Sequence, residues 1–122
     1  MSAVLPAALP VAADQIPIDV HTIDGTIVRA MSMSRERLDA DRLAELDELL
    51  RGHIALLLPP IRETAAKLWH GGTAWYQQAA RLDGIARQAE TEISSTPFAA
   101  LVQVQLLARD CQWLLNQHTG QK

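Results

Sequence analysis

The sequence has little cysteine, few aromatic residues and no excess charge of one sign. Its single cysteine, Cys111, cannot form an internal disulfide, and its four histidines are too scattered for a structural zinc site. The net charge is -3, and acids and bases alternate along residues 35–51 rather than forming a basic patch. We therefore expect no nucleic-acid partner, no structural metal and no cofactor, and the scarcity of cysteine favours a cytoplasmic protein.

Long apolar runs are also missing. The longest dense one, IALLLPPI at residues 54–61, is far shorter than the ~20 residues of a membrane span, so no membrane partner is expected. The opening MSAVLPAALPVAA lacks the basic start of a secretion signal and is interrupted by Pro6 and Pro10. Hydrophobic residues nevertheless make up 48% of the 122 residues, enough for one core. We predict a disordered lead-in at residues 1–17 and a single domain at residues 18–120.

Apolar residues recur at helical spacing in most of this domain, which predicts an all-α, up-and-down helical bundle of about four helices. Leucines 43, 46, 50 and 57 form one stripe, which begins after a capping Asp39 or Asp41. We expect Pro59 and Pro60 to break this helix, because each proline lacks an N–H and clashes with the preceding turn. A shorter helix would then restart and end at Gly71-Gly72.

Two further helices are predicted in the second half of the chain. Thr73 would cap one that runs to Ile93, with its apolar side chains on a single face. Pro97 would begin the other, which ends at about His118 before Gly120. Besides one broad apolar face, this last helix carries a second stripe, and we expect it to contact something on two sides. The second stripe consists of Val102, Leu106 and Trp113.

Residues 17–31 fit two structures. Asp24-Gly25 between VHTI and TIVR is typical of a hairpin turn, whereas Val20, Ile23, Ile27 and Met31 recur at helical spacing behind a capping Asp19. We predict a helix, although Gly25 in its middle costs about 1 kcal/mol of helix propensity. Such a helix would supply the partner for the second stripe of the last helix.

Three segments resemble a known family. They are LLRGHIALLLP at residues 49–59, WYQQAARLDGIARQ at residues 75–88 and VQLLARDCQWLL at residues 104–115. They are similar to an actinobacterial domain of unknown function, family 6415, whose members are often labelled natural product biosynthesis proteins. The resemblance covers residues 43–118 and implies a small helical domain of actinomycetes. It brings no catalytic residue with it.

Aromatic side chains are predicted to gather at one end of the bundle. In an antiparallel hairpin of residues 73–93 and 97–118, Trp75 and Trp113 would both lie roughly 24 to 27 Å from the connecting turn. The resulting aromatic pole would comprise Trp69, His70, Trp75, Tyr76 and Trp113, with His118 as a further candidate. It could stack a small aromatic or cationic ligand. The favoured alternative is that the rings plug the end of the bundle.

Three other polar residues invite a functional interpretation. His53 lies in an apolar stripe, where a hydrogen-bonded structural histidine is favoured over a ligand. Cys111 lies on the broad apolar face of the last helix and is expected to be an inert buried thiol. Arg109 separates the two apolar faces of that helix, so an interhelical or intersubunit ion pair with a carboxylate is expected.

Three classes of function are compatible with these residues. The leading hypothesis is a non-catalytic accessory or interaction protein that binds another protein, or itself, through the second stripe or the apolar residues 56–61. The alternative is a small-molecule binding module that uses the aromatic pole. An enzyme acting through His53, His70 or Cys111 is the third, and no spacing in the sequence supports it.

Overall fold

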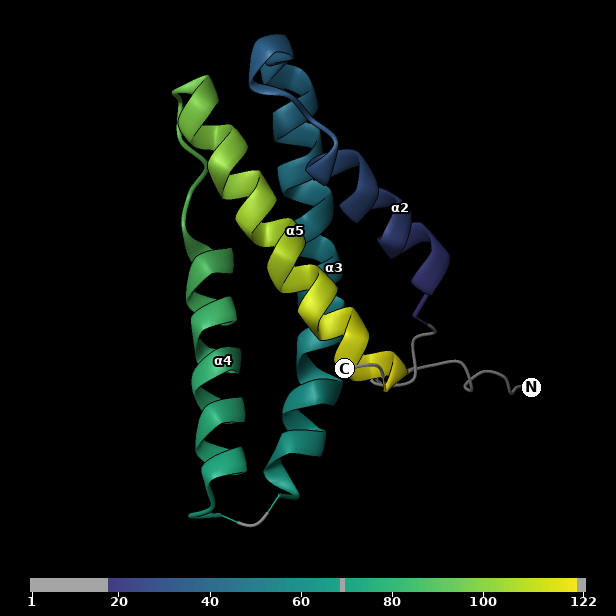
Figure 1. The fold of residues 1–122 in the computed structure, drawn as a ribbon, viewed down its shortest axis with the longest axis vertical. Helices are drawn as coiled ribbons and strands as arrows, with labels where there is room; N and C mark the ends of the chain where they lie inside the picture. The colour runs from purple at the N-terminus through teal and green to yellow at the C-terminus, as the bar shows by residue number, and fades with distance from the viewer. Residues whose placement is uncertain (1–17, 69, 121–122) are drawn as a thin grey trace, which may run out of the picture.

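The computed structural model describes residues 18–68 and 70–120, which contain four α-helices and no strand (Figure 1). The helices are α2 (Val20–Met31), α3 (Ala40–Ala66), α4 (Thr73–Glu90) and α5 (Pro97–Thr119), and a 3-10 turn, η2 (Arg35–Arg37), follows α2. Successive helices run in opposite directions, which confirms the predicted all-α, up-and-down bundle. The predicted lead-in, residues 1–17, lies outside the described residues. No helix of the described ranges combines the length and apolarity that crossing a bilayer requires.

The segment that also fitted a hairpin is the helix α2. Asp19 is its N-cap, and the Asp19 carboxylate accepts a hydrogen bond from the Thr22 N–H at 3.0 Å. Ile23, Ile27 and Ala30 are buried along one side, as their helical spacing predicts. Gly25 lies on the exposed side with no atom near its missing side chain. The burial of one apolar side thus outweighs the weak propensity of a central glycine.

The predicted break at Pro59-Pro60 is wrong, because α3 continues through both prolines to Ala66. Each proline deprives the carbonyl four residues earlier of its helical donor, and residue 55, the first of these, is solvent-exposed, where water can bind its carbonyl. Leu57 and Ile61, on either side of the prolines, are both buried in the core. Burial of one such side chain contributes roughly 1.5–3 kcal/mol, comparable with the ~3 kcal/mol penalty of a helical proline.

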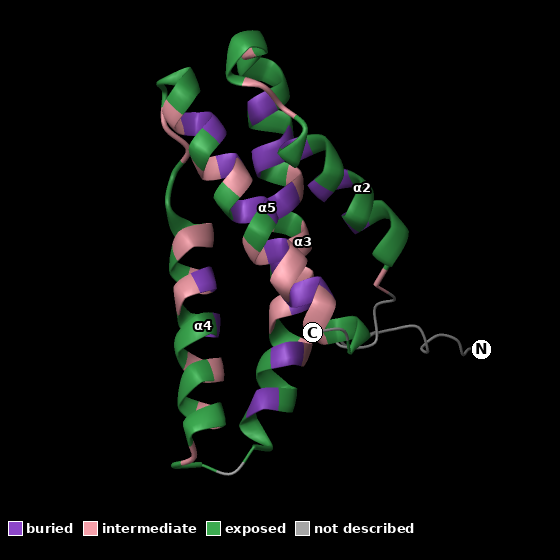
Figure 2. Cartoon of the chain, in the orientation of Figure 1, coloured by how far each residue is buried: buried purple, intermediate pink, exposed green. Residues whose placement is uncertain are grey.

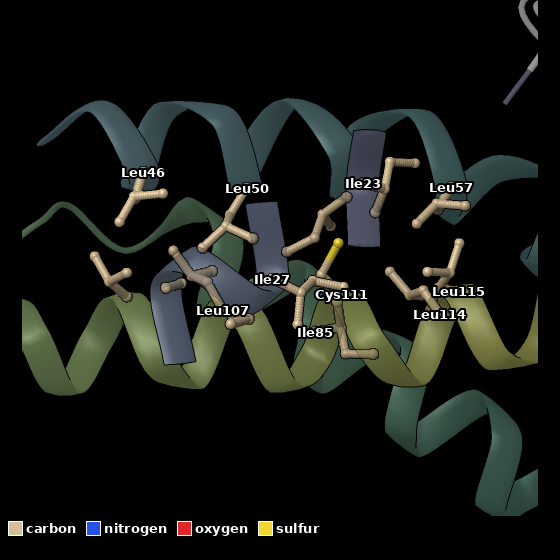
Figure 3. Packing of buried hydrophobic residues seen from close by; sticks show 14 of the residues in the cluster. Ile23, Ile27, Leu46, Leu50, Leu57, Ile85, Leu107, Cys111, Leu114 and Leu115 are labelled. Carbon is tan, nitrogen blue, oxygen red and sulfur yellow. The ribbon is translucent and has the colours of Figure 1, made fainter. Parts of the chain in front are cut away.

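The core lies mainly between α3 and α5, which make the most extensive contact in the bundle. Leucines of α3 point toward those of α5, and α2 crosses beside them (Figure 3). The fully buried leucines are Leu43, Leu46, Leu50 and Leu57 of α3, Leu82 of α4, and Leu107 and Leu114 of α5. The α3–α5 pair is therefore the centre of the bundle, with α2 and α4 packed on its two sides (Figures 1 and 2).

Long polar side chains of the central pair hold the ends of the outer helices. The Gln105 amide donates to the carbonyls of Ala30 at 3.2 Å and Met33 at 3.3 Å, at the end of α2. The Arg51 guanidinium donates to the carbonyls of Ala89 and Thr91, at the end of α4. These bonds satisfy carbonyls at the ends of the two helices. The helix α4 ends at Glu90 and not at the predicted Ile93.

The connection from α4 to α5, residues 91–96, is an extended segment and not a tight turn. It runs alongside the first turns of α5, so α4 is displaced toward the opposite end of the bundle (Figure 1). Gln103 holds it there: its amide donates to the Glu92 carbonyl at 2.9 Å and accepts from the Ser94 N–H at 2.6 Å. A hydrogen bond between Gln78 and Gln117 at 3.0 Å fixes the resulting register of α4 on α5.

Candidate functional site

The register of α4 on α5 divides the predicted aromatic pole. His70, Trp75 and Tyr76 lie together, with ring centroids 4.8 Å apart for the first pair and 4.9 Å for the second. With residue 78 level with residue 117, Trp113 lies about seven residues, roughly 10 Å, along the bundle from Trp75. Trp113 packs instead beneath Arg81, whose guanidinium carbon is 5.2 Å from the ring centroid.

The remaining members of the pole are placed as follows. Trp69 lies outside the described residues. His70 is exposed, and its Nε2 lies 3.1 Å from the Ala66 carbonyl at the end of α3. The Tyr76 side chain is 59% exposed, and Trp75 is half-buried between the two rings. His118, at the end of α5, borders a hollow of about 120 Å³ together with Pro60 and Gln117. The group of His70, Trp75 and Tyr76 is thus an open cluster at the turn between α3 and α4.

The second stripe of the last helix lies on the outward side of α5, opposite its buried side. Val102 is 44% exposed and Leu106 is 42% exposed, while Trp113 is half-buried beneath Arg81. The expectation that residues 18–31 would cover this stripe is wrong. Instead, α2 inserts its apolar side between α3 and α5, and Gln105 is the α5 residue that reaches its end. We call Val102, Leu106, Arg109 and Trp113 the outer stripe.

Leu106 forms a ridge between two hollows. On its α4 side lies a hollow of about 280 Å³, and on its other side one of about 100 Å³. The larger hollow is lined by Ala80, Arg81, Gly84, Ile85, Gln88, Leu106 and Asp110. The smaller one is lined by Val102, Gln105, Leu106 and Arg109. An arginine therefore borders the ridge on each side.

The two arginines differ in their ionic partners. Arg81 lies 3.4 Å from the Asp110 carboxylate, and this ion pair joins α4 to α5. Burial raises the pKa of Asp110, and the charge of Arg81 opposes that rise. Arg109 is exposed and has no carboxylate at ion-pair distance among the described residues, so the predicted interhelical pair of Arg109 is not formed. Asp110, the next residue, forms the interhelical ion pair instead, with Arg81.

His53 and Cys111 have structural environments. The His53 ring and the buried Thr26 hydroxyl are 3.0 Å apart, which connects α3 to α2 and confirms a hydrogen-bonded structural histidine. Burial lowers the pKa of His53, and the nearby charge of Arg29 lowers it further. Cys111 is fully buried, and burial raises the pKa of its thiol to about 12, which leaves it inert at neutral pH. Both groups are thus occupied in packing.

The apolar residues 56–61, the other predicted contact surface, belong in part to the core. Leu57 and Ile61 are buried, and Leu58 packs against the core. Within the described residues no three potential metal ligands lie close enough together to hold an ion.

The hollow between α4 and α5 was not predicted from the sequence. Its only signal is the spacing of the small residues Ala80 and Gly84, which lie outside the apolar face of α4.

Comparison with known proteins identifies a family but no individual related protein. No curated protein and no solved structure shows significant similarity to the chain. A model of one protein family matches residues 21–122, which include α3, α4, α5 and all of α2 except its first residue. That family is the one the three segments resemble: the chain belongs to the Family of unknown function (DUF6415).

Proposed function

We propose that the protein is a non-catalytic interaction module that binds a partner protein through the outer stripe of α5. The observation that carries this proposal is the exposure of Val102 and Leu106 on the outward side of a helix whose other side is fully packed. Contiguous exposed apolar side chains on a helix mark contact surfaces in soluble proteins. Covering an aliphatic side chain of this size contributes roughly 1.5–3 kcal/mol when burial is complete.

The setting proposed for this module is natural product biosynthesis in the cytoplasm of an actinomycete. The resemblance of residues 49–59, 75–88 and 104–115 to proteins with that label supports it. In this setting the module would be an accessory subunit that does not itself catalyse, because two of its three candidate catalytic residues, His53 and Cys111, are occupied in packing. Complex formation without turnover is the expected behaviour.

Photo-crosslinking tests the contact surface directly. A photoreactive amino acid placed at residue 106 should give a covalent adduct with another protein in the native host, because that position faces outward on the outer stripe. Leu68 is the matched control: it is 39% exposed, close to the 42% of Leu106, and it lies at the α3–α4 end of the bundle. Adducts at residue 68 but not at residue 106 would contradict the proposal.

A second candidate function is small-molecule binding at the turn between α3 and α4. The observation in its favour is the exposed ring cluster of His70, Trp75 and Tyr76. A flat or cationic ligand could stack on these rings. A screen of aromatic and cationic metabolites should then change tryptophan fluorescence in the wild-type protein and not in Tyr76→Ala. A screen in which both proteins respond equally would remove this candidate.

A further inference from the structure

The ridge of Leu106 has the shape of a helix-docking site. Side chains spaced three or four residues apart on one helix can straddle a ridge of another and enter the hollows on both sides. Here the hollows measure about 280 and 100 Å³ and share Leu106 as their common wall. A helix laid along α5 would thus place one side chain toward α4 and another toward Val102.

Small residues of α4 leave room for such a helix. Ala80 and Gly84 line the larger hollow together with the buried Ile85. A methyl group added at Gly84 would meet only the Arg87 guanidinium, at 3.9 Å, which is an ordinary contact. The space above Gly84 is therefore open to a methyl group, and a larger side chain there would extend into the hollow.

The charges beside the ridge favour an acidic partner. The whole chain carries a net charge of -3, yet both hollows are bordered by arginine. Arg81 is partly neutralised by Asp110, whereas Arg109 has no carboxylate at ion-pair distance in the described part of the chain. A guanidinium binds a carboxylate through paired, charge-assisted hydrogen bonds. Arg109 is thus available to a carboxylate on another molecule.

We propose that the Leu106 ridge seats an acidic amphipathic helix of a partner protein, with apolar side chains in both hollows and a carboxylate on Arg109. This inference rests on the proposed function and specifies its partner. A second copy of the chain fits less well, because its own outer stripe carries Arg109 and no carboxylate, and its Asp110 already pairs with Arg81.

Two synthetic helical peptides test this proposal with the full-length protein. Both carry the same leucine stripe and no aromatic residue, but one is flanked by glutamates and the other by lysines. Titration calorimetry should show the glutamate peptide binding at least about tenfold more tightly than the lysine peptide, with the difference shrinking as salt is added. In Arg109→Glu the preference should reverse.

A substitution that fills the hollow separates docking from folding. Gly84→Leu should weaken binding of the glutamate peptide by about tenfold or more while leaving the Tm unchanged or higher, because leucine is a better helix former than glycine. Gly25→Leu is the matched control on α2, where the missing side chain also faces open space. It should leave binding unchanged. Equal binding by Gly84→Leu and the wild type would overturn the proposed seat.

The other outcomes distinguish the two proposals. If both peptides bind the wild type equally and Gly84→Leu blocks both, the acidic partner is wrong and the contact surface stands. If neither peptide binds, the acidic helix is overturned, and light scattering of wild type and Leu106→Glu decides whether a second copy occupies the stripe. The crosslinking at residue 106 then tests the proposed function independently.

Discussion

The two outer helices of the bundle are held by different means. The shorter one, α2, has 12 residues and buries four of them, whereas α4 has 18 residues and buries only two (Figure 2). The difference lies in side-chain size: α2 presents two isoleucines and a threonine to the centre, and much of the inner side of α4 is alanine. Small side chains bury little area and leave hollows. The length of a helix is thus a poor guide to how firmly it is packed.

Buried isoleucines provide the strongest test of this contrast. Ile23→Ala in α2 should lower the free energy of unfolding by about 3–4 kcal/mol, because the cavity lies in a closed part of the core. Ile85→Ala in α4 should cost about 2 kcal/mol, since that side chain borders the open hollow and water can enter the space. Urea denaturation measures both. An equal or larger loss at residue 85 would show that α4 is packed as firmly as α2.

Removing Arg51, the polar anchor of α4, should cause the next largest loss of stability. Arg51 bonds the terminal carbonyls of α4 and also lies 2.9 Å from the carboxylate of the buried Asp47. Arg51→Ala should therefore lower the free energy of unfolding by about 2 kcal/mol. Hydrogen exchange should show α4 losing protection before α2. As a control, Arg87→Ala, at an exposed position of α4, should stay within about 0.5 kcal/mol of the wild type.

Substituting the central glycine of α2 should stabilise the protein. Gly25 is helical and its missing side chain faces open space, so Gly25→Ala should raise the free energy of unfolding by about 0.5–1 kcal/mol. Gly84→Ala in α4 should have a similar effect. The two Tm values check this. A larger gain in α4 than in α2 would indicate that α4 frays in the native state.

The smallest expected effect is the pH dependence contributed by His53, which fastens α2. Because burial lowers its folded pKa below the ordinary value of 6.5, the unfolded chain binds the proton more readily. The contribution of His53 to stability is fully present above pH 6.5 and is lost as the pH falls from there toward the folded pKa. His53→Gln should flatten this part of the stability profile, measured by urea denaturation at each pH. An unchanged profile would assign the pH dependence to other groups.

Local signals in the sequence determine most of the helices. Asp19 and Asp39 begin α2 and α3, and Pro97 and Gly120 bound α5 as predicted. The break at Pro59-Pro60 was wrong because a propensity argument omits the burial of neighbouring side chains. The positions of Trp75 and Trp113 along the bundle axis could not be predicted. They depend on the path of residues 91–96, which Gln103 fixes through contacts distant in sequence.

The candidate site could be predicted in part for the same reason. Helical spacing identifies Val102, Leu106 and Trp113 as a second stripe of α5, and the exposure of Val102 and Leu106 leaves that stripe as the surface to test. The hollows beside Leu106 depend on where α4 comes to lie, so periodicity within α5 alone does not reveal them. Whether Arg109 or Asp110 pairs with Arg81 likewise depends on tertiary placement, because the two residues are adjacent in the chain.

The proline pair in α3 makes the last turns of that helix a product of the assembled bundle. Beyond Pro60 the helix cannot draw on an unbroken ladder of backbone bonds from its first half, so residues 61–66 depend on Ile61 and Ala65 being packed. A free peptide of residues 40–66 should therefore be helical only up to the prolines. The end of α3, the ring cluster of His70, Trp75 and Tyr76, and the start of α4 would then fold and unfold as one cooperative unit, distinct from the α2 side.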